Sequence, residues 1–251
     1  MAGILPYIGG KNRLANEIID LFPSHHTYVE AFAGGASTFF RKQPSKVEVL
    51  NDLDGEVTNL FRVCQLHHEE LIRYMRWMVS SRDWFKLLEH TDTSTLTDIQ
   101  RAARTVYLQK NAYAGMVRRH SFNPGVLQPT GFNIERLPEI VAKAHERLAR
   151  VAIESLPYEQ VLKRYDRDTT LFFLDPPYYG RKLYNFNFEH EDFVTLAKRL
   201  TKLKGKFILS LNDLPEVRSI FSHFKIRGVE LHYTAQKKPG KRFKEVLITN
   251  F

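Results

Sequence analysis

The segment LFFLDPPYYG, residues 171–180, places an acid, two prolines and two tyrosines directly after a run of apolar residues. The apolar run is typical of a buried β-strand, so Asp175 is expected at the end of that strand. Pro176 and Pro177 lack a backbone N–H and restrict the chain to a stiff, extended turn, which can hold a carboxylate and a backbone carbonyl oxygen at fixed spacing. Two such acceptors match the two hydrogens of an amino group, and the Tyr178 ring offers a flat face on which a base can stack. The segment therefore predicts a clamp for a planar amine.

Two further candidate sites follow predicted strands nearer the N-terminus. In YVEAFAGGAS, residues 28–37, Gly34 and Gly35 lie between a strand and a helix. Glycines there let a ligand approach the backbone and the free N–H groups of the helix start, although a glycine pair also occurs in a plain tight turn. Asp52 ends the next strand, where a carboxylate can accept hydrogen bonds from ribose hydroxyls. The alternative is a helix cap, for which Asp54 is better placed.

The N-terminal segment LPYIGGKNRL, residues 5–14, places Tyr7, two glycines and Lys11 just before a predicted helix. This combination can seat a carboxylate or stack on an aromatic cofactor. Cys64, His67 and His68 have helical spacing, but three soft ligands without a second cluster do not predict a metal. No nucleophile elbow or catalytic triad is recognisable in the sequence.

The elements that must position these residues follow an α/β pattern. Helical patterns separate the predicted strands, several of which are continuous apolar runs of the kind buried on both faces. The predicted strands comprise residues 28–32, 47–51, 151–155, 171–175, 206–211, 229–233 and 245–250. Alternating strands and helices predict an open α/β sheet.

The alternation is interrupted once, between about residues 54 and 150. Residues 97–117 predict a helix rich in Arg, Lys and Tyr, and turn signals at 123–125 and 129–131 predict a hairpin or loop near residues 116–130. We therefore expect a mostly helical insertion.

Composition narrows the class of protein. Lys and Arg number 37 against 28 Asp and Glu, a formal net charge of +9, which favours a polyanionic partner through counterion release. A basic protein without a nucleic-acid role is the alternative. No secretion signal and no apolar run of about eighteen residues is found, so neither export nor a membrane span is expected. The single cysteine, Cys64, fits a reducing cytoplasm.

Taken in order, these motifs resemble the Dam-type DNA adenine-N6 methyltransferases, over nearly the whole chain. The carriers are PYIGGK, VEAFAGGAS, NDLDGEVTNLF, YLQKNAYAGMVRR, LFFLDPPYYG and EVLITNF. The resemblance implies a Rossmann-like methyltransferase sheet of about seven strands, with a mostly helical inserted target-recognition domain. It implies a catalytic domain of residues 1–56 and 146–251 and a DNA-binding domain of residues 57–145. Ala36 departs from the glycine that many amino-methyltransferases carry at the end of their first loop.

The resemblance also implies S-adenosylmethionine as methyl donor and a flipped-out adenine in double-stranded DNA as acceptor, in the cytoplasm of a bacterium or from a phage gene. The implied catalytic residues are Asp175, Pro176 and Tyr178. The implied cofactor contacts are Tyr7, Lys11, Phe32, Gly34, Gly35, Asp52, Tyr158 and Asp175. The insertion is expected to contact DNA through Lys110, Tyr113, Met116, Arg118 and Arg119, with Arg101, Arg104 and Phe122 as further candidates.

Several alternatives accompany this interpretation. The acceptor could instead be cytosine N4 or an RNA base, and a protein of another class, a non-catalytic DNA-binding module, could use the same scaffold. In the insertion, Tyr107 and Tyr113 could be helix-core residues and the arginines a solvated face. The basic loop of residues 236–245 could contact the DNA backbone or form a solvated hairpin tip.

Overall fold

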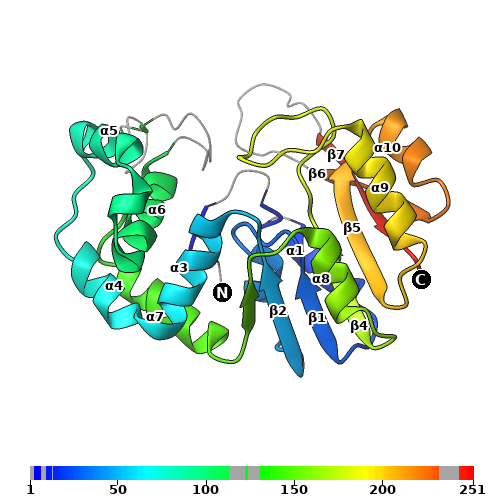
Figure 1. Cartoon of the computed structure of the whole chain (residues 1–251), viewed down its shortest axis with the longest axis horizontal. Helices are drawn as coiled ribbons and strands as arrows, with labels where there is room; N and C mark the ends of the chain where they lie inside the picture. The colour runs from blue at the N-terminus through cyan, green and yellow to red at the C-terminus, as the bar shows by residue number, and fades with distance from the viewer. Residues whose placement is uncertain (1–2, 7–9, 13, 113–121, 124–130, 232–242) are drawn as a thin grey trace.

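The computed structural model of the chain describes residues 3–6, 10–12, 14–112, 122–123, 131–231 and 243–251 (Figure 1). Its centre is a seven-stranded sheet with the spatial order β3-β2-β1-β4-β5-β7-β6. The strands are β1 (Thr27–Glu30), β2 (Val47–Asn51), β3 (Ala152–Glu154), β4 (Thr170–Leu174), β5 (Lys206–Asn212), β6 (Lys225–Leu231) and β7 (Phe243–Thr249). Strands β1 to β5 are parallel, whereas β7 is antiparallel to both of its neighbours.

The strand order reverses between β1 and β4. From β1 the chain proceeds outward through β2 and β3 on one side, and from β4 through β5 on the other. At such a switch point the connections after the two strands leave in opposite directions, which opens a crevice at the carboxyl ends of the strands. The crevice thus lies beside the ends of the strands that precede Phe32 and Asp175.

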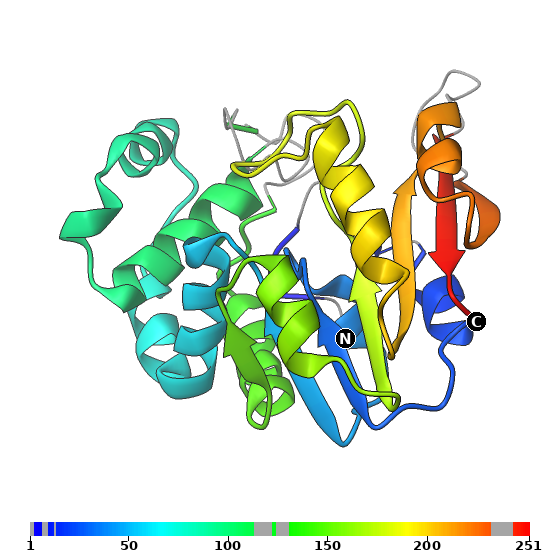
Figure 2. The same ribbon diagram turned by 45° about the vertical axis from the view of Figure 1, so that its right-hand side comes forward.

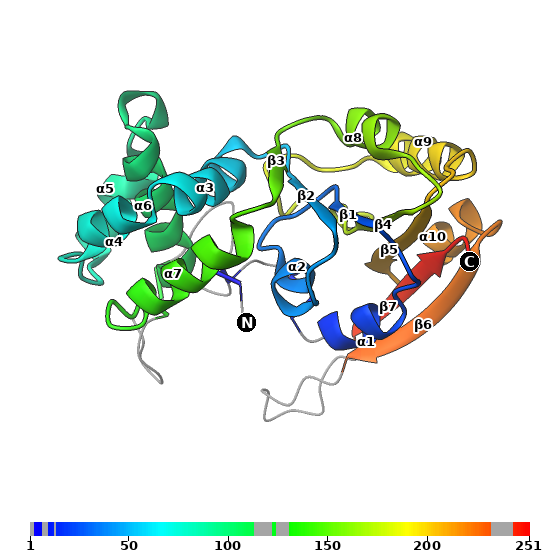
Figure 3. The same ribbon diagram turned by 90° about the horizontal axis from the view of Figure 1, so that it is seen from below.

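Helices cover both faces of the sheet (Figure 3). Helices α8 (Tyr158–Tyr165), α9 (His190–Leu200) and α10 (Pro215–Ile220) lie on one face, and α1 (Ala15–Asp20) and α2 (Ser37–Arg41) lie on the other. Successive residues of β4 alternate between these layers: Phe172 packs into the cluster that holds α8 and α9, and Phe173 into the cluster that holds α1 and α2. This double burial explains why β4 is apolar throughout.

The helical segment lies beyond the β3 edge of the sheet (Figure 2). It comprises α3 (Gly55–Leu66), α4 (His68–Met75), α5 (Arg82–His90), the short helix η1 (Thr93–Thr95), α6 (Asp98–Asn111) and α7 (Leu137–Leu148). Its core is continuous with one face of the sheet, since Phe85 and Tyr107 belong to the same hydrophobic cluster as Leu50. The division into domains at residues 57 and 145 therefore stays a prediction.

The predicted α/β sheet with a mostly helical insertion is confirmed. All seven predicted strands are present, β2 with the predicted bounds, while β6 begins at Lys225, four residues before the predicted start at 229. Helix α6 ends at Asn111, earlier than the predicted 117, because Ala112 leaves the helix to form an isolated antiparallel bridge with Phe122. The predicted hairpin or loop near residues 116–130 lies mostly outside the described residues. Among the helices that are described, none is long and apolar enough to span a membrane.

Candidate active site

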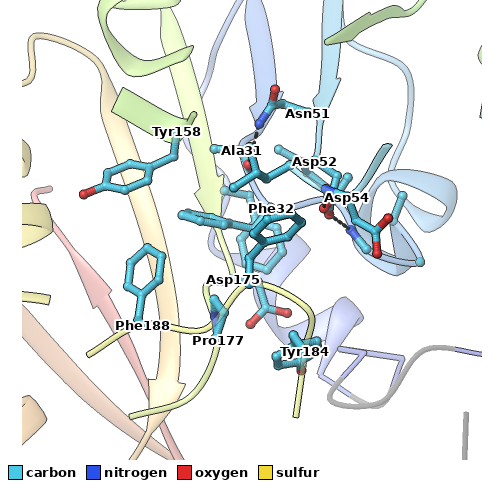
Figure 4. A pocket seen from close by; sticks show the side chains of 18 of the residues that line it. Ala31, Phe32, Asn51, Asp52, Asp54, Tyr158, Asp175, Pro177, Tyr184 and Phe188 are labelled. Carbon is cyan, nitrogen blue, oxygen red and sulfur yellow. Dashed lines mark hydrogen bonds between the residues drawn. The ribbon is translucent and has the colours of Figure 1, made fainter. Parts of the chain in front are cut away.

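A cavity of about 560 Å³ occupies the crevice at the carboxyl ends of β1, β2 and β4 (Figure 4). It is lined by the turn after β1 (residues 32–38), the turn after β2 (52–54), the start of α8, the corner after β4, and residues 184–188 of the β4–α9 connection. Its size falls within the range of small-molecule sites. Segments between residues 10 and 192 of the chain thus meet at one cavity.

The turn after β1 is tied to the turn after β2 by Asp52. The Gly34 N–H donates to Asp52 Oδ2 over 2.7 Å, and the Asp54 N–H donates to Asp52 Oδ1 over 2.9 Å. Gly34 has a φ of 47°, which glycine adopts without steric cost. Ala36, the departure from the glycine pattern, also has a positive φ of 49°, so the turn keeps the left-handed conformation for which a glycine would be favoured.

Burial raises the pKa of Asp52 from its ordinary 3.8 to about 6, against the opposing effect of the backbone N–H groups of Asp54 and Gly34. The carboxylate is thus ionised at neutral pH and protonated in mild acid. In the ionised form both of its oxygens accept hydrogen bonds, so it can accept the O–H hydrogens of ribose hydroxyls.

Three aromatic rings form one wall of the cavity. The ring centroids of Phe32 and Tyr158 are 5.5 Å apart, and the Phe188 centroid lies 5.7 Å from Phe32 and 5.6 Å from Tyr158. Such a group can accept a flat heterocycle. Phe32 and Tyr158 were predicted, whereas Phe188 was missed because it stands fourteen residues after Leu174 in a connection without a recognisable motif.

The strand ends beside this wall are joined by Asn51. Its Nδ2 donates to the carbonyl oxygens of Ala31 (2.9 Å) and Leu156 (3.0 Å), and its Oδ1 accepts from the Leu156 N–H over 2.9 Å. This side chain fixes the spacing of the β1, β2 and β3 ends. Asn51 is the first residue of the NDLDGEVTNLF motif and lines the cavity, but it was not among the predicted site residues.

Asp175 also lines the cavity, and its two oxygens have different surroundings. Oδ1 accepts hydrogen bonds from Lys11 Nζ (2.5 Å) and Ser210 Oγ (2.8 Å). Among the described residues no hydrogen bond to Oδ2 is found, and Asp175 lines the cavity with 18% of its side chain exposed. The described residues therefore fix one oxygen of Asp175 and form no hydrogen bond with the other.

Lys11 donates a hydrogen bond to Asp175 and is buried behind the residues that line the cavity. Only 3% of it is exposed. Burial alone would lower the pKa of Lys11, but the carboxylates of Asp175 and Glu245 outweigh burial and raise it, so the ammonium stays charged. Lys11 does not line the cavity, although Gly10 does, and its predicted contact with the cofactor stays a prediction.

Tyr178 points its hydroxyl away from the cavity. The hydroxyl donates to Glu245 Oε1 over 2.5 Å and accepts from Lys11 Nζ over 3.1 Å. Burial, with the carboxylates of Asp175 and Glu245, raises the pKa of Tyr178 far above its ordinary value. In contrast, Tyr184 lines the cavity together with Asp175 and Pro177, and it is a site residue that the sequence did not predict.

Comparison with known families decides the class of this site. The family model of the D12 class N6 adenine-specific DNA methyltransferases matches residues 7–235. The chain belongs to this family. The predicted enzyme class, adenine-specific DNA methyltransferase, is thereby confirmed, and S-adenosylmethionine is the methyl donor that this class implies.

Relatives of this D12 class enzyme come from bacteria and a virus. The Type II methyltransferase M1.LlaDCHI of Lactococcus lactis subsp. cremoris is 26% identical over 98% of this chain and 94% of its own length. The Type II methyltransferase M.CviBI of Paramecium bursaria Chlorella virus NC1A is 23% identical over 100% of this chain and 98% of its own length. The DNA adenine methylase of Haemophilus influenzae is 22% identical over 96% of this chain and 90% of its own length. The solved structure of SMU.776 with SAH overlays with a TM-score of 0.46 at 11% identity; it is matched over 98% of this chain, which spans half the length of that structure.

The residues of the cavity fit S-adenosylmethionine. The aromatic wall of Phe32, Tyr158 and Phe188 suits the adenine ring, and the Asp52 carboxylate suits the ribose hydroxyls. Gly35 lines the cavity beside Gly34, where backbone can approach the ligand. Tyr7 lies outside the described residues.

The DNA-binding candidates are placed unevenly. Tyr113, Met116, Arg118 and Arg119 lie outside the described residues. Lys110 is in the last turn of α6, and burial lowers its pKa. Its contact with DNA stays a prediction.

Three further DNA-binding candidates have intramolecular partners in this structure, and their contact with DNA stays a prediction. Arg101 Nη2 donates to Glu56 Oε1 over 2.5 Å, and Arg104 donates to the carbonyl oxygens of residues 88 and 89. Phe122 packs against Phe85 with ring centroids 5.4 Å apart. Tyr107 is fully buried, so the alternative of a helix-core tyrosine holds for it.

The Cys64–His68 spacing has a structural explanation. Burial raises the pKa of the Cys64 thiol to about 12. The His68 ring stacks on His145 at a centroid distance of 3.9 Å, and His145 Nδ1 lies 3.1 Å from the Cys64 carbonyl oxygen. Among the described residues no three acidic, histidine or cysteine side chains are grouped to hold a metal.

Proposed function

We propose that the protein transfers a methyl group from S-adenosylmethionine to N6 of an adenine flipped out of double-stranded DNA. One observation carries the proposal: Asp175 lines the same cavity as Phe32, Asp52 and Tyr158. A carboxylate that can grip an amino group and a wall that can hold an adenosyl group thus share one hollow. Such proximity replaces a bimolecular encounter with a positioned one.

The proposed clamp acts on the lone pair of the adenine amino nitrogen. That lone pair is delocalised into the ring, so the nitrogen is a poor nucleophile. Asp175 Oδ2 and the Pro176 carbonyl oxygen accept its two hydrogens and favour tetrahedral geometry, in which the lone pair points along one direction. When bound, S-adenosylmethionine supplies an electrophilic methyl group. Positioning and electrostatic stabilisation then suffice, with no covalent enzyme intermediate.

The target base must leave the duplex, at a cost of a few kcal/mol. Stacking on an aromatic ring offsets about 1–3 kcal/mol of this. Tyr178 is the ring that the resemblance implies for the role, and Tyr184 lies on the cavity surface beside Asp175. We propose Lys110, Tyr113, Met116, Arg118 and Arg119 as the DNA contacts, and the net charge of +9 supports a polyanionic partner. We also propose that the protein acts in the cytoplasm of a bacterium and is encoded there or by a phage.

The test is methyl transfer by Asp175→Ala and Asp175→Asn from labelled S-adenosylmethionine to unmethylated DNA. We expect kcat to fall at least about 100-fold, the loss typical of removing one stabilising group, while cofactor affinity changes little. Asp213→Asn is the matched control, because Asp213 also follows a strand but pairs with Arg218 over 2.6 Å outside the cavity. Its turnover should equal that of the wild type.

Nucleoside analysis of the product separates the alternatives. N6-methyladenine supports the proposal, and methylcytosine would transfer it to the rival acceptor. Tight, salt-sensitive DNA binding without methyl incorporation would instead support a binding module. Near-normal turnover by Asp175→Ala would refute the clamp.

A further inference from the structure

The turn after β4, residues 175–179, is held by hydrogen bonds to side chains of the neighbouring strands β5 and β7. Ser210 Oγ donates to Asp175 Oδ1, and Asn212 bonds the backbone of Tyr179 at both ends, accepting from its N–H (3.0 Å) and donating to its carbonyl oxygen (3.1 Å). Glu245 is the direct partner of Asn212 in the β5–β7 ladder. The Glu245 side chain therefore lies next to that of Asn212 on the same face of the sheet. Its Oε1 accepts a hydrogen bond from the Tyr178 hydroxyl over 2.5 Å.

Glu245 also shares a cation with the catalytic carboxylate. Lys11 Nζ lies 2.5 Å from Asp175 Oδ1 and 3.8 Å from Glu245 Oε2. The same ammonium lies 4.8 Å from the centre of the Tyr178 ring. A continuous set of contacts thus runs from Asp175 through Lys11 and Tyr178 to Glu245.

The cost of keeping this carboxylate buried indicates a role other than stability. Glu245 is 5% exposed, and within the described part of the chain its buried Oε2 has no hydrogen-bond partner, only the Lys11 ammonium at 3.8 Å. Burial, assisted by the nearby Asp175 charge, raises the pKa of Glu245. A buried acid with an oxygen that accepts no hydrogen bond destabilises a fold relative to a neutral side chain of similar size.

We propose that Glu245 is a positioning residue for methyl transfer, which anchors the Tyr178 ring and the Lys11 ammonium relative to Asp175. The inference rests on the proposed function. Without the Glu245 carboxylate, the Tyr178 hydroxyl loses its strongest acceptor, and Lys11 loses one of the two carboxylates that attract its ammonium. The Asp175 side chain and the flat ring then lose their fixed relative orientation.

The test compares Glu245→Gln with Glu48→Gln, the same change at another buried glutamate of the same sheet. Glu48 pairs with Lys42 and Arg147 and does not line the cavity. We expect Glu245→Gln to keep or raise Tm while kcat falls about 10-fold, with cofactor KM within about 3-fold of the wild type. Glu48→Gln should lower Tm by about 5 °C or more, since it leaves buried cations underpaired, and should keep kcat when assayed well below its Tm.

A double-mutant cycle with Tyr178→Phe tests the route of the effect. If Glu245 acts through the Tyr178 hydroxyl, each single variant and the double variant lose kcat by similar factors, about 10-fold, in place of a product near 100-fold. Multiplicative losses would overturn the proposed route, as would a Tm loss in Glu245→Gln equal to that of Glu48→Gln. If Glu245→Gln turns over like the wild type while Asp175→Ala is inactive, the inference about Glu245 is refuted and the proposed function stands. If the wild-type protein itself shows no turnover, the result counts against the proposed function.

Discussion

The carboxylates of Asp175 and Asp52 differ in the groups that donate hydrogen bonds to their oxygens. Asp175 has one oxygen bound by Lys11 and Ser210 and faces the cavity with the other. Asp52 has each oxygen bonded to one backbone N–H, from Gly34 and Asp54. The remaining lone pairs of a carboxylate oxygen can still accept from a ligand. The fixed donors therefore orient both acids without saturating them.

If Asp52 binds the cofactor ribose as proposed, its raised pKa should make the affinity for S-adenosylmethionine depend on pH. Its value of about 6 means that the carboxylate is protonated as the pH falls through 6 and loses acceptor capacity for the ribose hydroxyls. We expect the affinity for S-adenosylmethionine, measured by calorimetry, to be steady above about pH 7 and to weaken below 6. Asp52→Asn should bind about 10-fold more weakly, the worth of a hydrogen bond to a charged group, with no such pH step. A step retained in Asp52→Asn would assign it to another group.

At the scale of elements, the β4–α9 connection reaches across the cavity to the helical segment. Asn185 Nδ2 donates to Asp54 Oδ2 over 3.1 Å, while Asp54 Oδ1 accepts from the Glu56 N–H as the N-cap of α3. The predicted capping role of Asp54 is confirmed. One acid thus starts a helix and also receives the connection that carries Tyr184 and Phe188.

Removing this contact should loosen the connection around the bound cofactor. We expect Asn185→Ala to raise the dissociation rate of S-adenosylmethionine about 3- to 10-fold in stopped-flow measurements, the equivalent of one lost hydrogen bond, with an unchanged Tm. Asn133→Ala is the matched control, because Asn133 Oδ1 accepts from the backbone of residues 135 and 136 at an exposed turn. An equal effect of both variants would contradict a specific role for the Asn185–Asp54 contact.

At the scale of the whole molecule, two buried glutamates of β1 and β2 lie on the face of the sheet that packs against α1 and α2, yet their pKa values shift in opposite directions. Glu30, at the end of β1, is 2% exposed and accepts a hydrogen bond from the Tyr28 hydroxyl over 2.6 Å. Burial raises its pKa from 4.5 to about 8. Glu48, by contrast, has a lowered pKa, because Arg147 and Lys42 outweigh its burial.

The Glu30 carboxyl should make the free energy of unfolding fall as pH rises from about 5 to 8. The folded state keeps the proton up to about pH 8, whereas the unfolded chain loses it near 4.5, so unfolding releases a proton within that window and is favoured by rising pH. In urea titrations, Glu30→Gln should therefore gain stability relative to the wild type by about 1 kcal/mol or more across this range. A difference between the two proteins that does not change with pH would show that Glu30 titrates normally.

The sequence by itself determined the local elements and the acidic corner. Apolar runs predicted all seven strands, because a strand buried on both faces admits little else. The prolines after Asp175 and the glycines after β1 marked the two ligand-facing turns through their backbone restrictions. The helical character of the insertion was predicted from the same kind of local pattern.

Only the tertiary structure decided which distant groups meet. Lys11 and Asp175 are 164 positions apart and Tyr178 and Glu245 are 67 apart, and no periodicity encodes such partners. The antiparallel insertion of β7 between β5 and β6 places Glu245 opposite Asn212, and the path of the β4–α9 connection places Phe188 on the aromatic wall. Local patterns report how deeply a residue is buried, whereas its partner depends on how the whole sheet is ordered.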